Sequence, residues 1–282
     1  MKIAGRIEDL RALLRAHRSA SVGFVPTMGF LHGGHKSLIR RSASENDLTV
    51  VSVFVNPTQF GPAEDFLDYP RDLERDAAIA AEAGAAILFT PSVEEMYPGG
   101  EAEIAVLTGR LGDLGEGRFR PGHFDGVATV CAKLFNAVGA DNAYFGEKDA
   151  QQLAVVRRLV RDFVFNLEIV GCPTVRESDG LAMSSRNTRL DPDDRRAAPA
   201  LYEALSVAGV LAASGESSAE VLVASVQDSL AARPRVELQY AEVVDRDSFE
   251  PVAEVSGPAL LTAAAYVGGV RLIDNVTLNP PE

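Results

Sequence analysis

Strand-like and helix-like patterns alternate through the first two-thirds of the chain. Short apolar runs bounded by turn residues predict buried strands at 21–27, 47–58, 85–92, 142–146 and 167–174. Helical spacing of apolar residues predicts helices at 34–46, 71–84, 127–139 and 148–163, the second and third of them capped by Gly84 and Gly139. Strands that alternate with helices in this way predict right-handed crossovers and an α/β fold with a parallel sheet.

The pattern changes after about residue 175. Asp191 and Pro192 are typical of an N-cap and a first helical position, and they predict a helix over 190–205. A further helix is expected around 217–232, followed by three strands at 236–245, 259–267 and 270–278, whose short connections predict antiparallel pairing. We therefore predict two domains, at 1–175 and 176–282, the second being a smaller α+β domain with helices and a short antiparallel sheet.

Composition and charge narrow the classes of partner. The 282 residues are 46% hydrophobic, enough for a sizeable core, and 27 Lys and Arg against 40 Asp and Glu give a net charge of −13. This acidity argues against nucleic acid and anionic membranes as main partners, although one nucleotide in a local basic pocket remains compatible. The chain has no apolar run of membrane-spanning length and no secretory signal, and its only cysteines are Cys131 and Cys172. We expect a cytoplasmic protein.

Two histidines stand at the start of the predicted helix 34–46. In a parallel sheet, ligands bind beyond the carboxyl ends of the strands, and "PTMGFLHGGH" follows the first strand. His32 and His35 share one helical face, while Gly33 and Gly34 would let a phosphate approach the helix N-terminus. The imidazoles could then donate hydrogen bonds to a polyphosphate. The alternative is a turn with one capping and one solvated histidine; a zinc pair lacks a third ligand.

Three other clusters follow strand ends. Lys148 in "GEKDAQQ" could reach a phosphate, and Arg186 with two hydroxyls in "MSSRN" could clamp phosphate oxygens. Gln59 in "NPTQFG" could bind a hydroxyl or a carboxylate. Taken singly, each also fits a solvated or hydrogen-bonded turn. The acidic segment 61–72 reads as a solvated loop or a mobile flap. The chain has neither a Walker A loop nor G-x-G-x-x-G after a strand.

Several motifs together identify a family. "PTMGFLHGGH", "FVNPTQFGPAEDFLDYPRD", "GRFRPGHFDGVATV", "YFGEKDAQQL" and "MSSRN" closely resemble the pantoate–β-alanine ligase family, in that family's order. The resemblance runs from about Val25 to the closing "RLIDN". This family belongs to the nucleotidyltransferase superfamily, which includes class I aminoacyl-tRNA synthetases. The resemblance therefore implies a Rossmann-like sheet of the nucleotidyltransferase type, with the C-terminal domain as a lid.

The resemblance also implies an activity. The family condenses (R)-pantoate with β-alanine, using ATP with Mg²⁺ on its phosphates, through an enzyme-bound pantoyl adenylate, and releases AMP and pyrophosphate. It implies His35, His32 and Lys148 as catalytic residues, Gln59 for pantoate and β-alanine, and Gln152 for pantoate. The implied ATP site comprises Met28, Gly29, Phe30, Leu31, His32, Gly33, Gly34, His35, Gly146, Glu147, Lys148, Asp149, Val175, Met183, Ser184, Ser185 and Arg186. No protein metal site is implied.

Some details stay open. A homodimer is implied by the resemblance alone, and Glu116 and Arg120 match a segment that either contacts the other subunit or supports a loop. Phe30, Gly33 and Ala150 depart from the residues frequent in the family, without removing a polar role.

Two other functions compete with this one. They are a nucleotidyltransferase whose product keeps the nucleotide, and a nucleotide-sensing module without turnover. Length and charge disfavour a tRNA synthetase.

Overall fold

The computed structural model describes residues 1–61, 66–67, 69–100 and 102–279. The chain forms two compact units. The first comprises Met1–Glu147 and Val155–Pro173, and the second comprises Lys148–Ala154 and Thr174–Glu282. The second unit is therefore discontinuous in sequence. The two-domain division at 175 and 176 stays a prediction.

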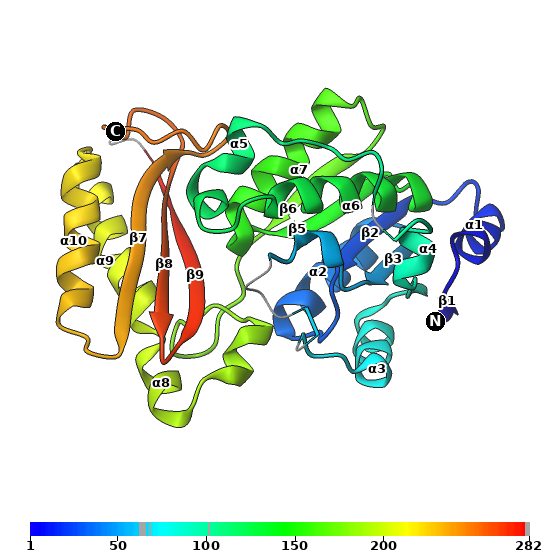
Figure 1. Ribbon diagram of the computed structural model, residues 1–282, viewed down its shortest axis with the longest axis horizontal. Coiled ribbons are helices and arrows are strands. Elements are labelled where there is room, and N and C mark those ends of the chain that lie inside the picture. Colours follow the sequence, from blue (N-terminus) through cyan, green and yellow to red (C-terminus); the bar gives the residue numbers. More distant parts are fainter. Residues whose placement is uncertain (62–65, 68, 101, 280–282) are drawn as a thin grey trace. The chain divides into compact units, whose positions relative to one another are not determined.

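A six-stranded parallel sheet forms the centre of the first unit (Figure 1). Its strands are β1 (Lys2–Ala4), β2 (Val22–Thr27), β3 (Leu48–Val53), β4 (Ile87–Phe89), β5 (Asn142–Gly146) and β6 (Glu168–Cys172). They lie in the order β1-β4-β3-β2-β5-β6, and all five pairings are parallel. The predicted parallel α/β sheet is confirmed. Sequence analysis missed β1, because three residues are too few to show a periodic pattern.

Helices cover both faces of this sheet. The helices up to residue 147 are α1 (Ile7–Arg15), α2 (Gly33–Glu45), α3 (Leu73–Ala83), α4 (Val93–Met96), α5 (Arg110–Asp113) and α6 (His123–Val138), with 3₁₀ turns η1 (Pro57–Gln59) and η2 (Gly115–Arg118). The 3₁₀ turn η3 (Glu147–Asp149) and helix α7 (Ala150–Asp162) follow, and Lys148–Ala154 within them belongs to the second unit. Val25 belongs to the core under α2 and α3, whereas its neighbour Phe24 packs edge-on against Phe135 of α6. Successive strand residues thus bury on opposite faces, which explains why the strands are continuous apolar runs.

The strand order reverses between β2 and β5. β2 pairs with β3 along its full length to Thr27, but with β5 only at Gly23 and Phe24. Pro26, which has no N–H to donate, lies beyond the last residue paired with β5. The two strands therefore part toward their carboxyl ends, at the place where doubly wound sheets bind ligands.

The second unit contains an antiparallel sheet covered by helices. β7 (Val236–Asp245), β8 (Ala259–Val267) and β9 (Val270–Leu278) lie in the order β7-β8-β9, with both pairings antiparallel, as predicted. The helices α9 (Ala200–Ala213) and α10 (Ala219–Ala231) lie side by side against this sheet (Figure 1). The buried apolar residues of the two helices and the three strands form one continuous core.

The helix expected over 190–205 is interrupted. Asp191 caps α8 (Pro192–Ala197), and its carboxylate accepts the N–H groups of Asp193 and Asp194, both at 2.8 Å. The helix ends there and α9 starts at Ala200, because Pro199 has no N–H for the next hydrogen bond. The single continuous helix was therefore a wrong prediction, while its N-cap is confirmed.

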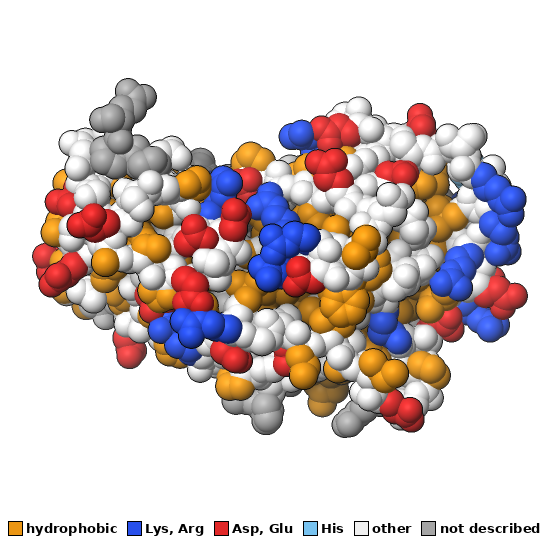
Figure 2. All heavy atoms as spheres, turned by 90° about the horizontal axis from the view of Figure 1, so that it is seen from above, with side chains coloured by type: hydrophobic (Ala, Val, Ile, Leu, Met, Phe, Trp, Pro, Cys, Tyr) orange, Lys and Arg blue, Asp and Glu red, His pale blue; other side chains and the backbone are white. Residues whose placement is uncertain are grey.

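The surface carries charge of both signs. On the face shown in Figure 2, acidic and basic side chains are intermingled with hydrophobic ones. Within the described ranges, no helix is both long enough and apolar enough to cross a membrane.

Candidate active site

The loop between β2 and α2 has an unusual backbone. Gly29 and Phe30 both adopt positive φ angles, of 86° and 50°. A Cβ at Gly29 would lie 2.8 Å from Val53 and 2.9 Å from Asp76, so only glycine fits there. Leu31 is fully buried and anchors the loop in the core. The loop thus needs support from its surroundings to hold this shape.

Asp76 of α3 supplies that support. Its two carboxylate oxygens accept the N–H groups of Phe30, at 2.8 Å, and of Leu31, at 2.6 Å, and the residue is only 1% exposed. The guanidinium of Arg75 lies over the Phe30 ring at 4.8 Å. Sequence analysis missed Asp76, because an acidic residue in the first turn of a helix reads as a partner of the helix dipole. Its position on the buried side of the helix was the available signal.

His32 and His35 form a capping box at the start of α2. Nδ1 of His32 accepts the N–H of Gly34 at 3.2 Å, and Nδ1 of His35 accepts the N–H of His32 at 3.3 Å. The ring centroids are 4.1 Å apart. A neutral imidazole whose Nδ1 accepts carries its hydrogen on Nε2, so these bonds assign the tautomer of both rings. Both histidines therefore cap the helix, whereas the alternative expected one capping and one solvated histidine. The caps also hold two Nε2–H donors at the positive end of a helix, and their role toward a phosphate stays a prediction.

Gln59, at the end of η1, is buried rather than solvated. Its Oε1 accepts from Nδ2 of Asn56 at 3.1 Å, and its Nε2 lies 3.1 Å from the sulfur of Met28. These contacts orient both ends of the amide. They also connect η1 with the loop that precedes the histidines.

Asn56 is the centre of a polar cluster around Gln59. Its Oδ1 accepts from the Tyr97 hydroxyl at 2.8 Å, and its Nδ2 also donates to the Gly126 carbonyl at 3.2 Å. Burial raises the pKa of the Tyr97 phenol. A Cβ on Gly126 would lie 2.4 Å from the Thr58 carbonyl oxygen, so glycine allows α6 to approach η1. Sequence analysis did not single out Asn56 or Tyr97, because their partners are distant in sequence.

A second set of contacts supports the backbone of Gln59. The Nδ1 atom of His123 lies 2.7 Å from the Gln59 carbonyl oxygen, and its Nε2 lies 2.9 Å from Nη1 of Arg120. Because arginine can only donate, Nε2 accepts and Nδ1–H donates to the carbonyl. The N–H of Arg120 donates to the Glu116 carbonyl at 3.0 Å. These contacts favour the loop-supporting alternative for this segment.

The expectation for the acidic segment 61–72 concerns residues that lie partly outside the described ranges, namely 62–65 and 68. In the remaining part, the rings of Phe66 and Tyr69 pack against Phe60, with centroids 5.5 and 5.9 Å apart. The Arg71 guanidinium donates to the carbonyls of Phe66, Leu67 and Tyr69. The described residues therefore form an aromatic cluster rather than a plain solvated loop.

A cavity of about 310 Å³ opens at the carboxyl ends of β2, β3 and β4 in the first unit. Its lining includes Met28, Gly29, Phe66 and Asp76. Gln59 is not part of this lining, but it contacts the cavity wall through Met28. The cavity has the size of a small-molecule site.

The predicted site residues at the end of β5 divide between the units. Gly146 is the last residue of β5 and Glu147 the first of η3, both in the first unit. Lys148, Asp149 and Gln152 belong to the second unit, where Gln152 is half-buried in α7.

Three of the predicted phosphate-directed residues meet in the second unit. Lys148, Ser184 and Arg186 line one small pocket of about 10 Å³, which is room for one water molecule. The Lys148 ammonium lies 3.6 Å from the Asp149 carboxylate, and this lysine side chain is 16% exposed. Positive charge and hydroxyl groups therefore gather at one place in this unit.

The segment before this pocket is a short hairpin. The N–H of Met183 donates to the Val175 carbonyl at 3.0 Å, and Arg176 and Ala182 form an antiparallel bridge. Ser184 then caps the 3₁₀ turn η4 (Ser185–Arg189), and its hydroxyl accepts the Arg186 N–H at 3.2 Å. The hairpin thereby delivers the residues from Met183 to Arg186 to the pocket. The individual roles of all these side chains remain predictions.

Comparison with known proteins gives a consistent result. The Pantoate-beta-alanine ligase family matches residues 2–277. A pantothenate synthetase of Geobacillus thermodenitrificans is 50% identical over 284 residues, covering 100% of this chain and 98% of that protein. One of Caldicellulosiruptor saccharolyticus is 48% identical over 280 residues, covering 99% of each.

The similar solved structures come from the same family as the similar sequences. The crystal structure of pantothenate synthetase from Thermus thermophilus is similar to this chain with a TM-score of 0.93 and 48% identity, over 99% of this chain and 100% of that one. Pantoate-beta-alanine ligase from Francisella tularensis, complexed with beta-gamma ATP and beta-alanine, gives a TM-score of 0.79 and 37% identity, over 98% and 97%. From its first residues to the end of β9, this chain belongs to the pantoate–β-alanine ligase family.

Proposed function

We propose that this chain condenses (R)-pantoate with β-alanine to pantothenate, converting ATP to AMP and pyrophosphate through an enzyme-bound pantoyl adenylate. One structural observation carries the proposal within the family. It is the pair of imidazoles whose Nδ1 atoms cap α2, at the carboxyl end of β2 where the strand order reverses. This arrangement suits a polyphosphate, because two imidazole N–H donors lie side by side at a helix N-terminus.

In the first step, the pantoate carboxylate attacks the α-phosphorus of ATP and pyrophosphate leaves. Negative charge grows on the phosphoryl oxygens, and the step needs positioning and N–H donors rather than a protein nucleophile. We assign donation from Nε2 to His32 and His35. Lys148 and Arg186 supply positive charge to the polyphosphate, with Lys148 acting as a point charge.

In the second step, the amine of β-alanine attacks the acyl carbon of the adenylate, and AMP leaves. We assign Gln59 to both pantoate and β-alanine, and Gln152 to pantoate. The orientation of the Gln59 amide by Asn56 and Met28 supports this assignment, because a buried amide held at both ends can select a polar substrate. Exclusion of water from the site would protect the adenylate from hydrolysis.

We propose that Mg²⁺ enters with the ATP phosphates. Among the residues with described positions, no three His, Cys, Asp or Glu side chains form a group that could hold a metal ion. Mg²⁺ keeps several waters and binds mainly through substrate phosphates. Bound there, it would neutralise phosphate charge.

We also propose a cytoplasmic homodimer. Ile104 and Leu107 of the first unit are 90% and 78% exposed, and a second copy could bury these two side chains. Both cysteines are free, buried thiols, which is compatible with a reducing compartment. Light scattering of the purified chain tests the dimer.

One assay tests the proposed function. With ATP, Mg²⁺ and pantoate but no β-alanine, the enzyme should exchange labelled pyrophosphate into ATP; adding β-alanine should then release AMP and pantothenate in equal amounts. A nucleotidyltransferase would instead give a product that keeps the nucleotide, and a sensing module would show no turnover. Steady pantothenate synthesis without pantoate-dependent exchange or bound adenylate would reject this mechanism.

A further inference from the structure

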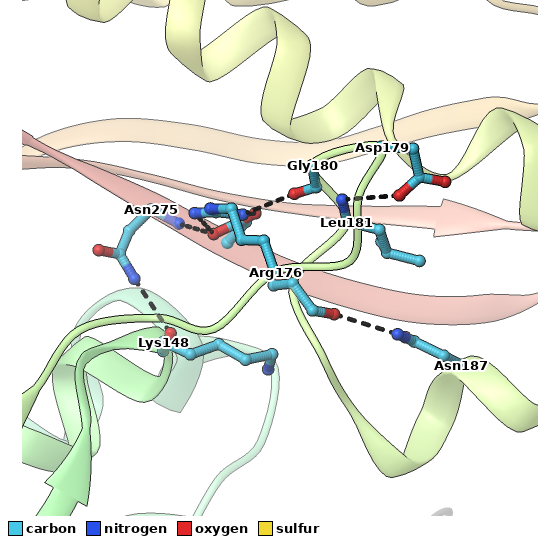
Figure 3. Close-up of polar contacts among 9 residues, drawn as sticks. Lys148, Arg176, Asp179, Gly180, Leu181, Asn187 and Asn275 are labelled. Carbon is cyan, nitrogen blue, oxygen red and sulfur yellow. Dashed lines mark hydrogen bonds and ion pairs between the residues drawn. The ribbon is translucent and has the colours of Figure 1, made fainter. Parts of the chain in front are cut away.

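Asp274 and Asn275, two consecutive residues of β9, contact two segments of the second unit that lead to predicted phosphate-directed residues. Figure 3 shows these contacts around Arg176 and Lys148. The Asp274 carboxylate accepts two hydrogen bonds from the Arg176 guanidinium, at 2.6 and 2.9 Å. Arg176 also donates to the Gly180 carbonyl at 3.1 Å and lies 3.5 Å from the centre of the Tyr202 ring. This largely buried ion pair anchors the hairpin that leads to Met183.

Asn275 holds the other segment. Its Nδ2 donates to the backbone carbonyl of Lys148 at 3.0 Å, across 127 residues of sequence. Its own N–H donates to Oδ1 of Asp274 at 2.8 Å. Figure 3 shows the Asn275 side chain extending from β9 toward Lys148. The backbone from which the Lys148 side chain arises is therefore tied to the strand that also orients Arg176.

We propose that Asn275 is a positioning residue for Lys148. The lysine side chain is long and flexible, so the place its ammonium can reach depends on where its backbone is held. The Asn275 amide holds that backbone next to the pocket lined by Lys148, Ser184 and Arg186. Asn275 acts through the lysine and touches no substrate in this scheme. The inference rests on the proposed role of Lys148 toward the ATP phosphates.

The amide is the chemically necessary group at this position. A carbonyl oxygen needs a donor, which asparagine supplies and aspartate does not. Asn275→Asp keeps the size of the side chain but places a carboxylate oxygen against the carbonyl of Lys148. Asn275→Ala removes the donor without adding charge. The two variants therefore test the hydrogen bond by different routes.

The experiment is a double-mutant cycle read by ATP affinity. The dissociation constant of ATP with Mg²⁺ is measured by calorimetry, without pantoate, for wild type, Lys148→Ala, Asn275→Ala, Asn275→Asp and the double variant Lys148→Ala/Asn275→Ala. Each single change should raise the dissociation constant of ATP about fivefold or more, which is the size of one lost hydrogen bond or charge contact. In the Lys148→Ala background, Asn275→Ala should change the affinity less than about twofold.

The control is Thr277→Ala, an exposed position on the same strand. It should leave ATP affinity within about twofold of wild type, and thermal unfolding should show folded protein for every variant. The KM for β-alanine should also stay unchanged in Asn275→Ala. Independent, multiplying losses in the double variant would overturn the proposal, because they mean that Asn275 does not act through Lys148.

Further outcomes are equally decisive. If Asn275→Asp binds ATP like wild type, or if Lys148→Ala does so, the proposal is wrong. If neither Asn275 variant folds, the residue serves folding rather than positioning. Failure of the proposed function is recognised separately, since it appears as missing pantoate-dependent pyrophosphate exchange in the wild type.

Discussion

The carboxylate of Asp76 lies 2.6 Å from the backbone nitrogen of Leu31 and accepts its hydrogen. The neighbouring Phe30 N–H bonds to the other oxygen of the same carboxylate. His32, the cap of α2, directly follows Leu31 in the chain. A buried side chain on one helix thus fixes the entry of another, and the alignment of both histidines depends on it.

Replacing Asp76 with asparagine should reveal this dependence. Asparagine keeps the size but offers one acceptor instead of two, and its NH₂ group would face a backbone N–H. We expect the free energy of unfolding to fall by about 1–3 kcal/mol, the cost of leaving a buried donor unsatisfied. Pantoate-dependent pyrophosphate exchange should fall as well. Chemical denaturation and the exchange assay measure the two effects.

Asp72→Asn is the matched control for stability. Asp72 caps the same helix, α3, by accepting the Arg75 N–H at 3.1 Å, and asparagine caps a helix as well as aspartate. Its free energy of unfolding should stay within about 0.5 kcal/mol of wild type. Equal stability losses in the two variants would mean that the contacts to Phe30 and Leu31 are unimportant.

His35→Gln should separate capping from catalysis. Glutamine at the third position of a capping box can accept the N-cap N–H, so it can replace Nδ1 of His35. It cannot replace the Nε2 donor. We expect kcat for pantothenate synthesis to fall about 10²-fold, with little change in melting temperature.

His35→Ala provides the comparison. It removes both functions and should also cost about 1 kcal/mol of stability from the lost cap. A His35→Gln enzyme with near-normal kcat would show that the imidazole is only a cap.

Gln59→Ala should weaken the binding of pantoate much more than the binding of ATP. We expect about a tenfold or larger loss of pantoate affinity and less than a twofold change for ATP, because the amide would contact pantoate and not ATP. Gln59→Glu keeps the volume but repels a carboxylate, so it should weaken pantoate at least as much. Calorimetric titration with each ligand decides this, and parallel losses for both ligands would contradict the assignment.

The two thiols should be unreactive in the folded enzyme. Burial raises the pKa of the Cys131 thiol to about 12, and it also raises the pKa of Cys172. At pH 8 the reactive thiolate of Cys131 is then on the order of 10⁻⁴ of the total. A disulfide reagent such as DTNB should titrate both thiols in urea and neither one within minutes in buffer. Rapid reaction of the native protein would contradict their burial.

The sign of the accompanying pH effect follows from the same burial. An unfolded cysteine ionises near pH 8.5, well below the pKa of buried Cys131. The unfolded chain therefore loses a proton that the folded chain keeps, and Cys131 makes the protein less stable as the pH rises above about 8.5.

Strands β2 to β6 could be predicted because buried parallel strands are apolar runs with clear turn signals, whereas β1 and α1 were missed. The division at Pro199 was missed, since the surrounding apolar spacing is helical on both sides and only the missing N–H breaks it. The histidine pair was visible as a spacing, but its capping geometry was not. A cap depends on which way each ring turns, and spacing alone does not show that.

The remaining site residues depend on contacts that no local pattern reveals. Asp76 meets a loop 45 residues away, and Asn275 meets a carbonyl 127 residues away. Tyr97 and Asn56 are likewise joined across 41 residues. Which side chains surround such a site depends on the folded structure, and the local spacing of apolar and polar residues does not show these distant contacts.

The discontinuity of the second unit has a consequence for dissection and recombination of this enzyme. A fragment that starts after residue 175 lacks Lys148–Ala154. Asn275 would then have no Lys148 carbonyl to bind, and the Lys148 side chain would be missing from the pocket of this unit. A chimera made by one crossover at that boundary would combine Lys148 from one parent with Asn275 from the other. The two segments therefore have to be inherited together, and grafting them as a pair is the natural way to exchange this unit between relatives.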